Sequence, residues 1–250
     1  MSIFWTLLRR ELASFFVTWT GYIIIAAVTL LTGLSFTVLI TILGAKPTTM
    51  PITDMFYQTY FFWLIVLLVS PIITMRLFAL EKAAGTFETL MTTRVGDAQV
   101  VIAKFAAALV FYMIMRLPLL ACLFILRHFT RQSTGMDAGT LGGMYLGIFL
   151  TGSLFLSLGC FASSLTRNQM TAAIVSFVLG VSLFALGFLA KAVVFGAKWQ
   201  SQVVSYFDVF AQMHDFSRGV VDTRTVAFYL TATFLFLFLT LRVVESRRWK

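Results

Sequence analysis

Residues 81–94, EKAAGTFETLMTTR, form a short mixed-charge segment in a chain that is otherwise mostly apolar. Four apolar side chains follow the i, i+4, i+7, i+8 spacing of one helical face: Ala83, Phe87, Leu90 and Met91. A helix of about two to three turns is too short to cross a bilayer, but it can lie at the surface and dock into a groove on a soluble partner. The pattern predicts a segment through which a partner moves the membrane part. An ordinary solvated connector between two spans is the alternative.

The surrounding sequence has the composition of an integral membrane protein. Of its 250 residues 60% are hydrophobic and 12% charged, and the mean hydropathy is +0.93. A soluble domain carries about 25% charged residues. The chain is therefore predicted to be an all-α membrane protein, with six apolar runs long enough to span: residues 19–43, 56–78, 100–126, 141–165, 170–195 and 226–244. In the fourth run Gly143 and Gly147 form a G-x-x-x-G pattern, which favours close packing within the chain over a dimer seam.

Charge predicts the orientation of the chain. Residues 1–18 repeat apolar side chains near helical spacing and are expected to form an interfacial helix ahead of the first span. Lys and Arg are more frequent on the side that holds both termini and the 81–94 segment, which predicts that this side is cytoplasmic. The net charge of +9 is assigned to topology and anionic lipid headgroups, because the basic residues lie at span ends. Binding to nucleic acid is not expected.

The longest predicted non-spanning stretch, residues 196–225, mixes aromatic and charged side chains. Such segments suit short helices that dip into the interface and are covered by protein. The candidate residues of this outer segment are Asp208, His214, Asp215, Arg218 and Gly219, the last of which would permit a turn into the final span. The alternative is a plain amphipathic surface loop.

Two motifs resemble those of a known family. The pattern E-K-x-x-G-T-x-E-x-L, residues 81–90, resembles the first cytoplasmic loop of ABC-2 type transporter permeases, most closely the gliding-motility-associated and copper-processing subgroup. The ending F-x-R-G-V-V-D, residues 216–222, resembles the same family. The chain departs at Arg94, where many members have proline, which bears on the exit of the loop.

The resemblance implies a fold and a set of site residues. It implies an interfacial elbow helix, a coupling helix at residues 81–94 that sits in a cleft of an ATPase subunit, and re-entrant extracellular helices at residues 196–225, as in type V exporters. The residues placed at the ATPase interface are Glu81, Lys82, Gly85, Thr86, Phe87, Glu88 and Leu90.

The predicted function is that of a permease subunit of an ATP-driven exporter in a bacterial inner membrane. No lysine in the sequence follows a glycine, so a phosphate-binding P-loop is not expected, and ATP and magnesium are assigned to a partner subunit. A second permease copy or a related permease would complete the pathway. The main alternative is a non-transporting scaffold of a motility or envelope complex with the same fold. An intramembrane enzyme is a weaker one, because catalytic groups at a common depth are missing.

Arg116 is the one basic residue predicted to lie near the middle of a span, two positions before Pro118. A charge at that depth is costly and marks a functional-site hypothesis. Its expected partners are Asp208 or Asp215 if the outer segment dips inward, carbonyls freed near Pro118, a partner chain, or an anionic substrate. The alternative is a structural role, with bonds to carbonyls or snorkelling to headgroups. His128 and His214 stand alone, so no metal site is predicted.

Overall fold

The structure is a computed structural model that describes residues 2–45, 52–86, 96–130, 138–192 and 207–246. Within these ranges the regular elements are α-helices. They are α1 (Ser2–Val17), α2 (Trp19–Ala45), α3 (Ile52–Gln58), α4 (Tyr60–Thr74), α5 (Ala79–Ala83), α7 (Asp97–Met115), α8 (Leu117–Thr130), α9 (Ala138–Leu165), α10 (Gln169–Ala192), α12 (Val209–Ser217) and α13 (Thr223–Ser246).

The prediction of six spans is confirmed for the described part of the chain. Six helical stretches are long and apolar enough to cross a membrane: Trp19–Ile42, Tyr60–Ala83, Asp97–Leu126, Gly139–Leu165, Gln169–Gly187 and Thr223–Ser246. Helix α9 is the centre of the bundle. In its most apolar 18-residue stretch 83% of the residues are buried, whereas the corresponding share in α13 is 17%. It packs against α13, α10, α4, α12 and α7. The outer helices carry the exposed apolar side chains that a lipid environment requires.

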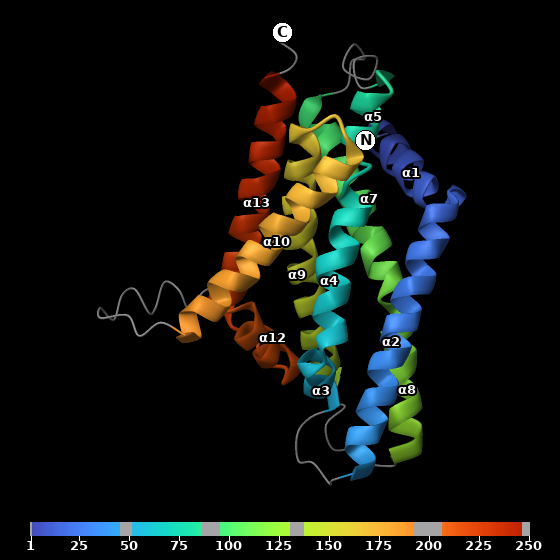
Figure 1. The fold of residues 1–250 in the computed structure, drawn as a ribbon, viewed down its shortest axis with the longest axis vertical. Helices are drawn as coiled ribbons and strands as arrows, with labels where there is room; N and C mark the ends of the chain where they lie inside the picture. The colour runs from blue at the N-terminus through green and yellow to red at the C-terminus, as the bar shows by residue number, and fades with distance from the viewer. Residues whose placement is uncertain (1, 46–51, 87–95, 131–137, 193–206, 247–250) are drawn as a thin grey trace.

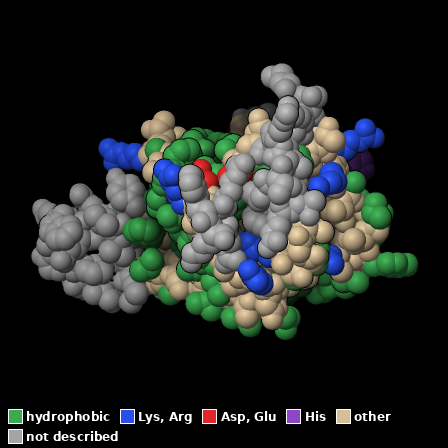
Figure 2. Space-filling view, turned by 90° about the horizontal axis from the view of Figure 1, so that it is seen from above, with side chains coloured by type: hydrophobic (Ala, Val, Ile, Leu, Met, Phe, Trp, Pro, Cys, Tyr) green, Lys and Arg blue, Asp and Glu red, His purple; other side chains and the backbone are tan. Residues whose placement is uncertain are grey.

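The two ends of the bundle differ in their elements. Helices α1 and α5 lie at the same end as the C-terminal end of α13, while α3 and α12 lie toward the other end (Figure 1). Basic side chains are spread over the first of these ends, and acidic ones show only in a small inner area of it (Figure 2). Exposed side chains near this end include Arg9, Arg10, Arg167 and Arg242. The even number of crossings thus returns the chain to its starting side, as predicted.

Two of the predicted spans are interrupted. The second was predicted as a continuous helix over 56–78, but Thr59 has an extended backbone and separates α3 from α4. The carbonyl of Tyr57 is satisfied there by the Trp63 indole N–H at 2.8 Å. Pro71 lies inside α4, which continues to Thr74. Proline is tolerated in membrane helices where neighbouring groups satisfy the freed backbone.

The third predicted span, 100–126, is also two helices. Helix α7 ends at Met115, Arg116 is its C-cap, and α8 starts at Leu117. Pro118 lies in the first turn of α8, where the missing backbone N–H costs little. Because proline cannot donate the i to i−4 hydrogen bond, α7 cannot continue through this position as a regular helix. The Arg116 carbonyl accepts hydrogen bonds from the Leu119 N–H and the Tyr145 hydroxyl, each at 3.1 Å. The break is therefore supported by one side chain of a neighbouring helix, Tyr145 of α9.

Small residues of α9 allow close contacts within the chain. A Cβ on Gly143 would lie 2.7 Å from the Phe216 carbonyl oxygen, and one on Gly147 would lie 2.9 Å from the Met213 sulfur. Both contacts are with α12. The prediction that the G-x-x-x-G pattern serves packing within the chain is confirmed.

Gly159 gives a direct test of this packing. A Cβ there would lie 2.0 Å from Thr74 Oγ1 and 2.7 Å from Thr74 Cβ, at the contact of α9 with α4. Gly159→Ala is therefore expected to lower the free energy of unfolding by about 1–3 kcal/mol, measured as a reduced Tm in detergent. Gly142 is exposed on the same helix with nothing within 4 Å of an added Cβ. Gly142→Ala is the matched control, and an equal Tm loss in both variants would contradict the expectation.

Candidate functional site

The segment that leads into residues 81–94 is fixed to the end of the central helix. The Ser163 hydroxyl of α9 accepts hydrogen bonds from the backbone N–H groups of Phe78 at 3.2 Å and Ala79 at 3.1 Å. The Lys82 ammonium donates to the carbonyl of Ser164. These bonds satisfy N–H groups at the start of α5, which otherwise lack partners inside the helix. Helix α5 is thus held to α9 by its backbone and by one of its side chains.

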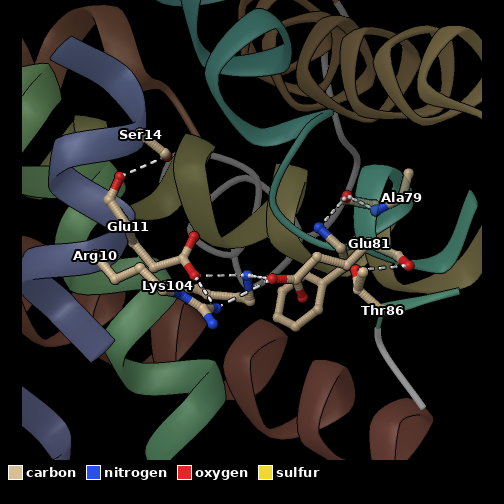
Figure 3. Close-up of polar contacts among 9 residues, drawn as sticks. Arg10, Glu11, Ser14, Ala79, Glu81, Thr86 and Lys104 are labelled. Atoms are coloured by element: carbon tan, nitrogen blue, oxygen red, sulfur yellow. Dashed lines mark hydrogen bonds and ion pairs between the residues drawn. The ribbon is translucent and has the colours of Figure 1, made fainter. Parts of the chain in front are cut away.

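Four charged side chains from three helices meet beside α5 (Figure 3). We call Arg10 and Glu11 of α1, Glu81 of α5 and Lys104 of α7 the ion cluster. The Lys104 ammonium lies 2.8 Å from Glu81 Oε1 and 3.1 Å from Glu11 Oε1. The Arg10 guanidinium lies 2.7 Å from Glu11 Oε1 and 3.2 Å from Glu81 Oε1. Each cation therefore bridges both carboxylates, and the cluster carries no net charge.

Burial makes Lys104 the centre of the cluster. Its side chain is 2% exposed, against 10% for Glu11, 19% for Glu81 and 52% for Arg10. The Lys104 ammonium also lies 5.7 Å from the centroid of the Phe78 ring. Paired charges in such surroundings are screened little by solvent, so each member depends on the others.

Two further features describe the cluster's chemistry. The hydrogen bond from Arg10 to Glu11 raises the pKa of Arg10 above its ordinary value, against the opposing effect of partial burial. Glu81 Oε1 receives both cations, while the buried Oε2 accepts no hydrogen bond from the described residues. The ion cluster therefore connects α1, α5 and α7 by ion pairs.

The structure changes the interpretation of residues 81–94. They were predicted to form one amphipathic helix, but α5 ends at Ala83 and Gly85 has φ +72°, a left-handed conformation that favours glycine. Thr86, which is exposed, is helical again, and its hydroxyl lies 3.4 Å from the Glu81 carbonyl oxygen. Phe87, Glu88 and Leu90 lie outside the described residues. The turn at Gly85 separates Glu81 from the remainder of the predicted coupling helix.

Glu81 and Lys82 have contacts within this chain that the sequence did not predict. Both were predicted to face a partner ATPase, yet their side chains contact Lys104, Arg10 and the end of α9 within this chain. The exposed positions of the described segment are Ala83 to Thr86. A partner that contacts this loop would first meet the residues that follow α5.

Glu11 and Lys104 were missed as site residues. Lys104 was counted only as part of the charge bias, because nothing near it in the sequence pairs with it. Glu11 did carry a signal: with Leu8 and Phe15 it follows the i, i+3, i+7 spacing of the buried face of α1. A carboxylate on an apolar stripe needs a buried partner. The identity of that partner required the fold.

Arg116 is 3% exposed and its environment is aromatic. Its guanidinium carbon lies 4.9 Å from the Phe62 ring centroid and 5.1 Å from that of Tyr112, and Nη2 donates to the Tyr112 hydroxyl at 3.0 Å. Cation–π contacts offset part of the cost of such a burial, at about 0.5–2 kcal/mol each. The predicted pairing with Asp208 or Asp215 is not present. The enclosure of Arg116 by protein does not favour snorkelling.

At the opposite end, α3 and α12 are joined by polar side chains. Asp54, 1% exposed, lies 2.6 Å from His214 Nδ1 and accepts a hydrogen bond from the Ser217 hydroxyl at 3.0 Å; Arg218 Nη2 lies 4.0 Å away. The Thr53 hydroxyl donates to the Ser217 carbonyl at 2.7 Å. We call this group of residues the α3–α12 clasp.

The other candidates of the predicted outer segment have local roles. The Asp208 side chain accepts from the Ala211 N–H at 3.1 Å and caps the N-terminus of α12. Asp215 is exposed. Gly219 has φ +78° and follows the C-cap, where the Val220 N–H donates to the Asp215 carbonyl at 3.0 Å. Helix α12 has nine residues, too few to span a bilayer.

No group of three or more metal-ligating side chains comes together in the described ranges. Cys122 and Cys160 are free. Among the described residues, the ion cluster lies at one end of the bundle and the α3–α12 clasp at the other (Figure 1).

The geometry agrees with a comparison against known families. A family model described as "ABC-2 family transporter protein" matches residues 16–183, more than half of the 250 residues. The match includes α5, Lys104, Arg116 and the whole of α9. No curated protein matches the chain.

Proposed function

The chain belongs to the ABC-2 family of transporter proteins, and from this premise we propose that it is the permease subunit of an ATP-driven exporter. It is a multi-pass membrane protein, and permeases of this family generally act as the non-catalytic membrane component beside an ATPase. In our proposal ATP and magnesium bind to that separate subunit, and a second permease completes the pathway. The end that holds α5 faces the cytoplasm, in agreement with its basic surface (Figure 2).

The observation that supports this proposal most strongly is the ion cluster at α5, the helix that leads into the predicted coupling loop. A force on this loop reaches α1 and α7 through Glu81, and it reaches α9 through Ser163 and Lys82. Energetic coupling between two distant sites is carried by packed side chains, ion pairs or rigid helices that can adopt two discrete conformations. Here the connection runs from α5, which is followed by the exposed residues 84–86, to the central helix α9.

The proposal divides the predicted coupling residues by role. Glu81 and Lys82 hold the loop to its own chain, while Glu88, with Phe87 and Leu90, is assigned to the ATPase cleft by the family likeness. From the resemblance of residues 81–90 alone we further propose that the chain belongs to the gliding-motility-associated and copper-processing subgroup. Carboxylates of the loop would pair with basic groups of the ATPase.

Charge reversal at Glu88 tests the division. Glu88→Lys is expected to reduce the ATPase recovered with the tagged chain from native membranes by about tenfold, or ~1.4 kcal/mol in binding, while the Tm of the purified chain stays unchanged. Mass spectrometry and an ATPase assay on the eluate provide the measurement. Glu245→Lys is the matched control, because Glu245 lies near the end of α13, where it pairs with Arg242.

Two outcomes would contradict the proposal. Recovery of the wild-type chain with envelope proteins and no ATPase would favour the non-transporting scaffold. Equal loss of the ATPase in Glu88→Lys and Glu245→Lys would show that only the overall charge of this end matters.

A further inference from the structure

Arg116 has more hydrogen-bond donors than the described residues supply with acceptors. A guanidinium carries five N–H donors. One hydrogen bond is present, from Nη2 to the Tyr112 hydroxyl, and Nε is buried without a partner. The Tyr112 hydroxyl in turn has no acceptor for its own proton among the described residues. Two neighbouring buried donors are thus left without an acceptor.

The charge of Arg116 is also uncompensated within the described ranges. The acidic side chains there lie elsewhere: Glu11 and Glu81 in the ion cluster, Asp54 in the α3–α12 clasp, Asp97 in the first turn of α7, Asp208 at the N-cap of α12, Asp215 and Asp222 at the surface, and Glu245 beside Arg242. Aromatic rings screen the cation, but they carry no net negative charge. An anion from outside the chain would satisfy both the charge and the free donors.

The surroundings indicate what kind of anion fits. Leu117, the next residue, is 52% exposed, and it begins an exposed face of α8 that continues through Ala121, Phe124 and Ile125. An apolar face is ordinary for a membrane helix, but this one starts at the residue that follows Arg116, at the break between α7 and α8. A carboxylate or phosphate could pair with the Arg116 guanidinium, and a hydrocarbon chain attached to it could lie on the exposed apolar face of α8.

We propose that Arg116 and Tyr112 bind the anionic group of an amphiphile whose hydrocarbon part lies along the exposed face of α8. Binding requires a shift at the α7–α8 break or of the Phe62 ring, because the guanidinium is buried in the state described. This inference rests on the proposed transport function in one respect: it assigns acidic amphiphiles as the class of molecule carried.

The test uses the purified full chain in neutral detergent, without an ATPase, so that its result is independent of the partner. Four probes are titrated and followed by native mass spectrometry and by Tm: oleate, oleyl alcohol, dioleoyl phosphatidylglycerol and inorganic phosphate. The wild type is expected to bind oleate at least about tenfold more tightly than oleyl alcohol, and Arg116→Gln is expected to remove this preference.

A matched control separates the site from general charge. Arg242 lies 4.9 Å from the Phe238 ring, as Arg116 does from Phe62, but it is exposed and paired with Glu245. Arg242→Gln should retain the full preference for oleate. If Arg116→Gln does not fold, Arg116→Lys replaces it in the test. Lysine keeps the positive charge but lacks the planar set of guanidinium donors, so the preference for oleate over oleyl alcohol should fall several-fold.

Each outcome decides the inference. Equal binding of oleate and oleyl alcohol by the wild type, or an unchanged preference in Arg116→Gln, would overturn it. Saturation by inorganic phosphate alone would overturn the amphiphile in favour of a small-ion site. Binding of phosphatidylglycerol without oleate would keep the anion site but overturn the substrate assignment, since the source would then be a membrane lipid. Failure here with an intact ATPase complex would leave the proposed function standing.

Discussion

Lys104→Met is expected to lower the free energy of unfolding by about 3–5 kcal/mol, the cost of leaving buried charge unpaired. The Lys104 side chain is 2% exposed and lies within 3.1 Å of carboxylate oxygens of Glu11 and Glu81. Its loss leaves two carboxylates to share Arg10, which is half exposed. Methionine keeps most of the volume, so the expected loss comes from the charge and not from a cavity.

The measurement is the unfolding midpoint in detergent, for the variant and for two companions. Arg9→Met removes an exposed cation from the same helix as Arg10 and should change stability by less than ~0.5 kcal/mol. The triple variant Glu11→Gln, Glu81→Gln, Lys104→Met removes the unpaired charges and should recover part of the loss. If the triple variant is no more stable than Lys104→Met, the ionic account of the cluster is wrong.

The variants also bear on coupling. If the ion cluster transmits the movement of the loop, the triple variant should retain the ATPase partner yet lose transport-coupled stimulation of its activity. That result would separate assembly, assigned to Glu88, from transmission, assigned to Glu81 and Lys104. Normal stimulation in a stable triple variant would restrict the cluster to a structural role.

The coarse architecture was predictable because it depends on local composition. Six apolar runs predicted six spans, and the G-x-x-x-G pattern of α9 predicted packing within the chain; both follow from rules that act over about 20 residues. The breaks at Thr59 and Arg116 were not predicted, although Pro118 marked the second. Pro71 lies within α4 without ending it. A proline alone therefore does not distinguish a tolerated residue from a helix boundary, since that depends on which neighbours satisfy the backbone.

The site was predictable only in part. The loop after the second span was identified from residues 81–94. The ion-pair partners of Glu81 were not identified: Arg10 lies 71 positions earlier on α1, and Lys104 lies on α7. Pairing over such separations is set by the packing of α1 against α7, which the sequence pattern does not specify. Arg116 was predicted to need a partner, and the structure shows neutral aromatic ones.

At the other end of the bundle, Asp54→Ala is expected to cost about 3 kcal/mol, from the loss of hydrogen bonds to a buried carboxylate worth about 1.5–3 kcal/mol each. Asp54 is 1% exposed and holds His214 and Ser217 of α12. Without it, α12 keeps the Thr53 contact and its packing on α9, but His214 and Ser217 lose their hydrogen bonds to Asp54 of α3. Hydrogen exchange of the α12 amides should rise with the loss of stability.

Asp215→Ala is the matched control, because Asp215 lies next to His214 on the exposed side of the same helix. It should alter stability by less than ~0.5 kcal/mol, and α12 exchange should remain at the wild-type rate. The ion cluster and the α3–α12 clasp share no residue, so Asp54→Ala and Lys104→Met should add within ~0.5 kcal/mol in the double variant. A larger deviation would mean that α9, which contacts both α5 and α12, carries free energy from one end of the bundle to the other.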